Sequence, residues 1–155
     1  MDGTGNNFNP DGIITRGRMV IMLYRMEGEP AAAASSFSDV SAGQDYTNAV
    51  AWASANSIVE GVGNNRFEPG NEIRWEDAVT ILYRYAKYKG YDVTAAGDLS
   101  VYPDSGKVSS YAKDAMTWAV GAKLINDIDG KLIPGDFTNR AQMAQLLMNF
   151  CEKVA

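Results

Sequence analysis

The feature that most constrains this chain is an internal repeat. A stretch rich in glycine and asparagine that ends in proline occurs at 3–10 and again at 61–69, and an apolar helical pattern follows each copy. A weaker third copy ends at Pro134, and the prolines of successive copies are 59 and 65 residues apart. Such a period predicts copies of one supersecondary unit that stack and share a core.

Each copy leads into a segment with apolar residues at i, i+3, i+4 and i+7, the pattern of an amphipathic helix. The three apolar faces are Met19, Met22, Leu23 and Met26; Ala78, Ile81, Leu82 and Tyr85; and Met143, Leu146, Leu147 and Phe150. Core packing accounts for this pattern. Thr15 and Asn139 are predicted N-caps, with Gln142 completing a capping box, whereas Arg74 in the middle copy is a poor cap.

A second helical pattern, rich in alanine, surrounds Trp52 and Trp118, which are 66 residues apart. An aromatic-x-Asp sequence precedes each of these segments and ends at Asp39 or Asp104, which we expect to cap the following turn or helix. The chain is therefore predicted to be an all-α protein of helix–loop–helix units that form one compact domain. The predicted boundaries are 1–28 for the second half of repeat 1, 37–89 for repeat 2 and 100–154 for repeat 3.

Composition excludes several function classes. The chain has 155 residues, a net charge of −5, no histidine and one cysteine, Cys151, which we interpret as a small core or near-core residue rather than a reactive thiol. Histidine-based catalysis and histidine metal sites are excluded, and a net acidic chain lacks the field that attracts nucleic acid. We expect no enzymatic activity, no metal and no cofactor. No apolar run is long enough to insert into a membrane, and residues 1–7 lack the features of a signal peptide.

Several ordered motifs together resemble the repeat of the S-layer homology family. They are Phe37-Ser38-Asp39, the segment 49–53 with its Trp-Ala pair, the segment 58–61, Phe67-Glu68-Pro69 and Leu82-Tyr83-Arg84. The resemblance implies a pseudo-threefold bundle with short connecting turns or minor β pairing. It also implies an extracellular wall anchor of Gram-positive bacteria. Such anchors bind anionic secondary cell-wall polysaccharides, often with a pyruvate ketal, in grooves between adjacent repeats.

The family's leading ligand contact is the arginine of a Thr-Arg-Ala-Glu motif, and Arg16 and Arg140 occupy this position. At the first position of a helix, a guanidinium beside free backbone N–H groups would suit a carboxylate. The middle repeat has Trp75 there, with Arg74 one residue earlier. Either Arg74 reaches the same anion or the middle groove is inactive.

Asn65, Trp52 and Trp118 complete the predicted set of ligand-binding residues. For the two tryptophans, a place in the core is the alternative that we favour over a sugar platform. The helix-start arginines have an alternative as well, because they could be solvated or paired with an aspartate such as Asp39 or Asp104.

A second function fits the departures from the family pattern. A module with degenerate grooves would bind a surface or host protein instead of a polysaccharide. The incomplete first repeat also predicts that the face formed by Met19, Met22 and Met26 is under-covered. Either later segments of the chain wrap this face, or a second copy covers it in a homodimer.

Overall fold

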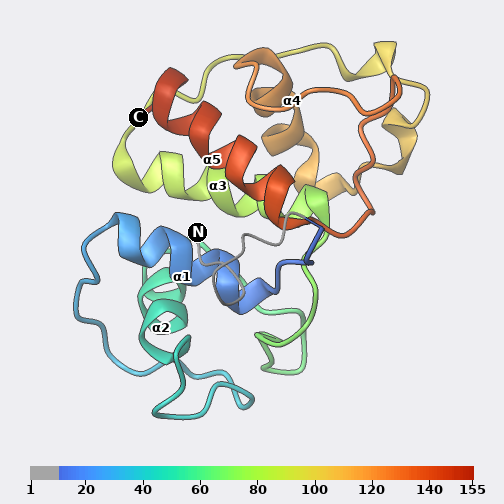
Figure 1. Ribbon diagram of the computed structural model, residues 1–155. Helices are drawn as coiled ribbons and strands as arrows, with labels where there is room; N and C mark the ends of the chain where they lie inside the picture. The colour runs from blue at the N-terminus through green and yellow to red at the C-terminus, as the bar shows by residue number, and fades with distance from the viewer. Residues whose placement is uncertain (1–10) are drawn as a thin grey trace.

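The computed structural model describes residues 11–155, so the first glycine- and asparagine-rich motif lies outside the described residues. The described part is helical and contains no strand, which confirms the all-α prediction (Figure 1). Its α-helices are α1 (Arg16–Met26), α2 (Thr47–Ala55), α3 (Trp75–Lys89), α4 (Lys113–Gly121) and α5 (Arg140–Lys153). Short 3-10 turns at Leu99–Val101, Ser105–Lys107 and Ser110–Ala112 lead into α4.

The helices pack across the repeat boundaries. Helix α2 packs against α1 of the preceding repeat, and α4 packs against α3 in the same way (Figure 1). One hydrophobic cluster runs through all three repeats and includes Trp52 and Trp118, each with only 1% of its surface exposed. The expectation that Trp52 and Trp118 belong to the core is confirmed. Their assignment to the ligand-binding set is wrong, because no sugar ring can stack on a buried indole.

A closed ring of backbone hydrogen bonds marks the pseudo-threefold axis. The N–H of Ile14 donates to Thr138 O, that of Thr138 to Ile73 O, and that of Ile73 to Ile14 O, each over 2.9 Å. These residues stand just before α1, α3 and α5, and isolated antiparallel bridges such as Thr15–Glu72 flank the ring. The predicted minor β pairing is therefore present. The sequence also suggests a short pairing of Phe8-Asn9 with a segment of the Phe67-Glu68 type, and this pairing lies outside the described residues.

The helix starts agree with the capping predictions. Thr15 Oγ1 accepts a hydrogen bond from the N–H of Arg18 over 3.1 Å, and Asn139 forms a complete capping box with Gln142. Arg74 precedes α3 without a side-chain capping bond. All three helices begin at the residue directly after the predicted cap, since capping and apolar periodicity are both local properties of the sequence.

Asp39 and Asp104 do not cap the following helices, so that prediction is wrong. The carboxylate of Asp39 accepts from the N–H groups of Phe67 and Glu68, both over 2.8 Å. Asp104 accepts in the same way from Leu132 and Ile133, over 2.9 Å. Burial alone would raise the pKa of both carboxyls, but these backbone N–H groups outweigh it and hold each pKa below its ordinary value. Each aspartate thus joins the beginning of a repeat to the loop 28 residues later.

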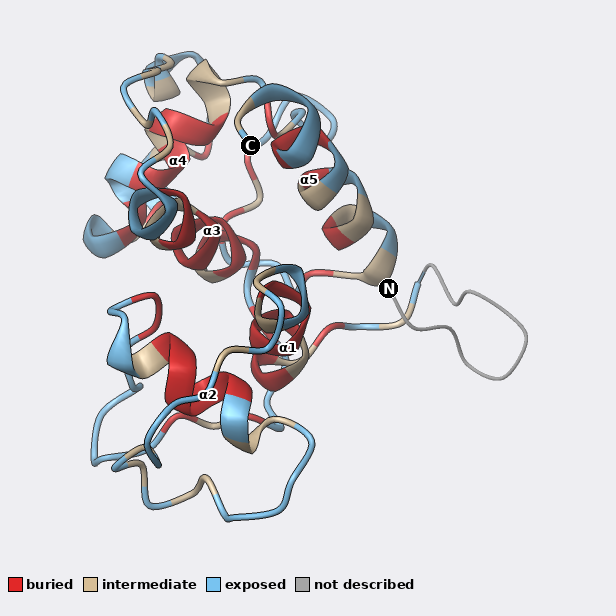
Figure 2. Cartoon of the chain, turned by 90° about the vertical axis from the view of Figure 1, so that its left-hand side faces the viewer, coloured by how far each residue is buried: buried red, intermediate tan, exposed pale blue. Residues whose placement is uncertain are grey.

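The apolar face of α1 is covered except at its end. Met19 is fully buried and Met22 is 9% exposed, whereas Met26 is 42% exposed, so the predicted under-coverage applies to Met26 alone. Cys151 is exposed, which contradicts its assignment to the core. It lies on α5, one side of which faces solvent in Figure 2.

Candidate functional site

The backbone N–H groups at two helix starts are already used by the fold. The N–H of Arg16 donates to Asn71 O over 2.8 Å, and that of Gly17 to Pro69 O over 2.9 Å. In the next repeat the N–H of Trp75 donates to Asp136 O over 2.7 Å. The N–H of the following residue, Glu76, donates to a second loop carbonyl, Pro134 O. The expectation that free N–H groups at these starts receive an anion is therefore wrong. Any contact with an anion has to come from side chains.

The guanidinium of Arg16 is held in a defined orientation. Nε donates to Phe67 O over 2.9 Å, Nη2 donates to Glu60 O over 3.5 Å, and the group lies 4.8 Å from the centre of the Phe67 ring. Nη1 is 3.9 Å from Asp77 Oδ2. Burial lowers the pKa of Arg16 and the charge of Asp77 opposes this effect, yet a guanidinium stays protonated under all ordinary conditions.

Arg16 lines a groove of about 410 Å³ to which all three repeats contribute. Repeat 2 supplies 59–62 and Arg84, and repeat 3 supplies Tyr111. Arg84 provides a second guanidinium, with Nη2 3.7 Å from Glu60 Oε2. We name this the Arg16 groove. Sequence reasoning missed Arg84 as a site residue, although the Leu82-Tyr83-Arg84 motif contained the signal.

An acidic side chain and a tyrosine form one wall of the Arg16 groove. The hydroxyl of Tyr111 donates to Asp77 Oδ1. Burial, this hydrogen bond and the nearby carboxylates raise the pKa of Tyr111, so it remains a neutral donor at physiological pH. The groove therefore combines two guanidinium groups with two carboxylates, those of Asp77 and Glu60.

The two positions that correspond to Arg16 and Arg84 one repeat later carry no cation. Trp75 replaces Arg16 and is 6% exposed, and Asn149 replaces Arg84 and is 8% exposed. The amide of Asn149 donates to Leu124 O over 2.9 Å and accepts from Gln145. These side chains are turned inward and carry no charge.

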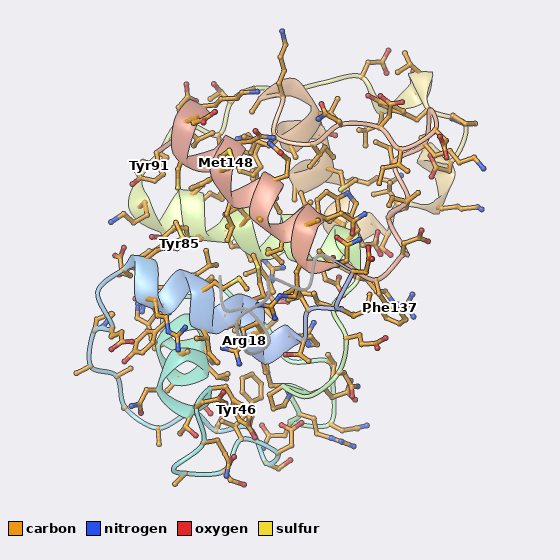
Figure 3. All side chains as sticks on the ribbon, in the orientation of Figure 1. Arg18, Tyr46, Tyr85, Tyr91, Phe137 and Met148 are labelled. Atoms are coloured by element: carbon orange, nitrogen blue, oxygen red, sulfur yellow. The ribbon has the colours of Figure 1, made fainter. Side chains whose placement is uncertain are left out.

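Arg74, next to Trp75, contacts the loop before α5. Its Nη1 donates to Gly135 O over 2.8 Å, and its guanidinium lies 5.2 Å from the centre of the Phe137 ring. Arg74 and Phe137 line a second groove of about 560 Å³, and Arg16 and Asp77 line it as well. Phe137 is labelled in Figure 3, just before α5. The role of Arg74 as a ligand contact stays a prediction.

The remaining predicted residues have different surroundings. Arg140 begins α5, its backbone N–H donates to Gly12 O over 2.8 Å, and its side chain is half-buried; its role as a ligand contact stays a prediction. Asn65 has a left-handed backbone with φ 58° and donates to Ser36 O. It lies outside the lining of the Arg16 groove and serves to hold the linker before repeat 2.

No cluster of cysteine and acidic side chains in the described part of the chain is placed to hold a metal ion. The turn at 127–130 is closed by Asp127, whose carboxylate accepts a hydrogen bond from the N–H of Gly130. None of the helices among residues 11–155 combines the length and the apolar character that crossing a membrane requires.

These features define a helical repeat domain with a cyclic, pseudo-threefold arrangement and a charged groove between repeats. The family model described as S-layer homology domain matches residues 36–79 and 101–144, together more than half of the chain. The chain therefore belongs to the S-layer homology domain family. This membership indicates association with the bacterial cell surface, and the domain of this family is a non-catalytic anchoring module.

The relatives include proteins of different kinds. The chain is 30% identical to the Surface-layer 125 kDa protein of Lysinibacillus sphaericus over 132 residues. This match covers 84% of the chain and 11% of the relative. It is 28% identical to Exoglucanase XynX of Acetivibrio thermocellus, over 97% of the chain and 14% of the relative. It is 25% identical to an Amylopullulanase of Thermoanaerobacterium thermosulfurigenes, over 97% of the chain and 8% of the relative. The chain thus spans only a small part of each relative.

Proposed function

We propose that this chain anchors a protein to the bacterial cell wall by binding an anionic secondary cell-wall polysaccharide in the Arg16 groove. A carboxylate on the sugar, such as that of a pyruvate ketal, is the group that we expect Arg16 and Arg84 to bind. The observation that carries the proposal is the fixed orientation of the Arg16 guanidinium at the groove. A guanidinium whose orientation is set before binding loses little freedom when it receives a carboxylate.

The charges of the groove are compatible with such a ligand. Glu60 has a side chain that is 77% exposed, and its contact with Arg84 is 3.7 Å long. An exposed ion pair of this kind contributes little to stability. A ligand carboxylate can therefore replace Glu60 as the partner of Arg84. Asp77 is already engaged by Tyr111 and is suited to accept further hydrogen bonds from sugar hydroxyls.

The relatives support attachment rather than shared chemistry. A surface-layer protein and enzymes with different named activities all contain a segment similar to this chain. A segment common to proteins whose named roles differ is best explained by a role that they share, and attachment to the cell surface is such a role.

The test is retention on purified cell-wall sacculi, before and after chemical removal of the polysaccharide. We expect Arg84→Ala to weaken retention by about tenfold or more, because truncating one partner of a hydrogen-bonded charge pair costs that much or more. Arg84 has a half-buried side chain without a buried hydrogen bond, so the melting temperature should hardly change. Arg16→Lys should also lose most binding, since an ammonium cannot form the two-pronged contact of a guanidinium.

Lys113→Ala is the matched control, because it removes a positive charge from an exposed position at the start of α4. Full retention of folded Arg84→Ala and Arg16→Lys would contradict the groove assignment. Retention that survives removal of the polysaccharide would favour the second candidate, a protein–protein interaction module. One observation favours that candidate. Trp75 and Asn149, which stand at the positions of Arg16 and Arg84 one repeat later, carry no charge.

A further inference from the structure

A second groove continues the Arg16 groove. We name the groove of about 560 Å³ that Arg74 and Phe137 line the Phe137 groove. Arg16, Val62 and Asp77 line both grooves, so the two grooves meet at these residues. Pockets that hold small ligands commonly have about 300–1,000 Å³, so each groove has room for a sugar unit. A chain of sugars that occupies the Arg16 groove can therefore continue into the Phe137 groove.

Phe137 presents an exposed aromatic ring to this groove. Its side chain is 44% exposed, whereas the next residue, Thr138, is fully buried in the hydrogen-bonded ring at the pseudo-threefold axis. The corresponding positions in the other two repeats hold Ile13 and Glu72, so the fold does not require an aromatic side chain here. One face of a sugar ring consists of C–H groups, and such a face packs well against an aromatic ring.

Arg74 fixes the position of the Phe137 ring. An antiparallel bridge joins Arg74 to Phe137, and the guanidinium lies 5.2 Å from the ring centre while Nη1 donates to Gly135 O over 2.8 Å. A ring that is held in place before binding loses little freedom when a ligand packs against it. The bond to Gly135 uses one of the five N–H donors of the guanidinium, so other donors can reach a sugar hydroxyl.

The charges of the Phe137 groove favour an uncharged sugar. Its lining contains two guanidinium groups and three carboxylates, which belong to Arg16, Arg74, Glu68, Glu72 and Asp77. Because the carboxylates outnumber the guanidinium groups, a further negative charge is disfavoured in this groove. Carboxylates accept hydrogen bonds readily from sugar hydroxyls. The anionic unit of a polysaccharide is thus directed to the Arg16 groove and an uncharged unit to the Phe137 groove.

We propose that the Phe137 groove is a second subsite, which binds an uncharged sugar unit adjacent to the anionic unit held by Arg16 and Arg84. The ring of this sugar stacks on Phe137, and Arg74 acts as a positioning residue. This inference rests on the proposed function, because the anionic unit in the Arg16 groove places its neighbour. The ligand of this chain is then a pair of adjacent units rather than a lone anionic group.

The experiment measures how affinity depends on ligand length. Polysaccharide released from purified sacculi is cut into fragments that contain the anionic unit alone or together with its neighbours, and each fragment is titrated into the whole chain by calorimetry. We expect the wild type to bind the longer fragments more tightly. Phe137→Ala should weaken their binding about three- to tenfold, because the sugar covers somewhat less than half of the ring. Binding of the anionic unit alone should stay unchanged.

Two further variants make the test independent of Phe137 itself. Gly70 lines only the Phe137 groove, and a Cβ atom there would meet no other atom within 4 Å. Gly70→Leu should therefore occlude the subsite without disturbing the fold and weaken only the longer fragments. Arg74→Ala should give the same loss, restricted to the longer fragments. The matched control is Ile13→Ala, because Ile13 occupies the corresponding position, is 43% exposed and lines neither groove.

The outcomes separate this proposal from the proposed function. Arg84→Ala should weaken the binding of every fragment, including the anionic unit alone. Equal affinity of the wild type for short and long fragments would overturn the second subsite and leave the Arg16 groove assignment intact. So would unchanged binding of long fragments to Phe137→Ala and Gly70→Leu, or an equal loss for the anionic unit alone. If no fragment binds the wild type, the proposed function fails and the second subsite fails with it.

Discussion

Asp104 gives the most direct test of how a repeat is held together. Its carboxylate receives the N–H groups of Leu132 and Ile133, each over 2.9 Å, and the side chain is almost buried. The change to alanine removes both acceptors and leaves two backbone donors unsatisfied. Asp39 makes the same pair of bonds in repeat 2, so the two sites can be compared within one chain.

The magnitude follows from these contacts. A hydrogen bond to a charged group contributes about 1.5–3 kcal/mol to stability. Two such bonds give about 3–6 kcal/mol, and the lower end applies because Ile133 is only half-buried and water can reach its N–H after the change. For a domain of this size, each kcal/mol lowers the melting temperature by about 2–4 °C. We therefore expect Asp104→Ala to melt about 6–12 °C below the wild type.

The pH dependence gives an independent measurement of the same contact. Because the pKa of Asp104 is lower in the folded chain than in the unfolded chain, its contribution is fully present above about pH 4. The contribution is lost as the pH falls through the folded value. Thermal unfolding of wild type and variant, followed by circular dichroism from pH 7 to pH 3, should show the difference in melting temperature shrinking in acid.

The control is Asp92→Ala, since the exposed carboxylate of Asp92 bonds only to Thr94, two residues away. This variant should show a much smaller shift. A melting temperature for Asp104→Ala within about 2 °C of the wild type at pH 7, less than the shift expected for 1 kcal/mol, would refute the reasoning. So would a large difference that does not change with pH.

Two further changes test packing at the axis and at the groove. Thr138 is fully buried, and its hydroxyl has no hydrogen-bond partner among the described residues. Thr138→Val should therefore raise the free energy of unfolding by about 1 kcal/mol, measured by urea unfolding. A lower free energy of unfolding would contradict this. A Cβ atom at Gly61 would lie 2.7 Å from Arg66 O, so Gly61→Ala should lower the free energy of unfolding by about 1–3 kcal/mol. A Cβ atom at Gly70 would meet open space, so Gly70→Ala should lower it much less. Equal effects of the two glycine changes would contradict the packing argument.

The local part of the fold could be predicted from the sequence. Apolar periodicity and capping act within a few residues, so α1 and α5 begin where Thr15 and Asn139 predicted. Burial of Trp52 followed from its alanine-rich helix. The exposure of Cys151 could not be predicted in this way, because it depends on which helix covers α5 and not on α5 itself.

The contacts between distant segments could not be predicted from local patterns. Local patterns predict that Asp39 caps the turn or helix that follows it, but Asp39 bonds to a loop 28 residues later, and Asp104 does the same. The equal spacing from each aspartate to its loop in the two repeats was the available signal. Similarly, local reasoning counted the N–H of Arg16 as free, whereas a carbonyl of the next repeat accepts it.

The helix starts show how this fold separates its scaffold from its binding groups. Arg16 and Trp75 occupy the same position, and their backbone N–H groups bond to the next repeat over 2.8 and 2.7 Å. The backbone bond is the same although one side chain is charged and the other is apolar. These bonds between repeats therefore constrain only the main chain at this position, and the side chain sets the chemistry of each groove. A repeat can lose its guanidinium, as repeat 2 has, and the ring still closes. It follows that the charge of each groove has to be determined from its own residues and not from the presence of the repeat.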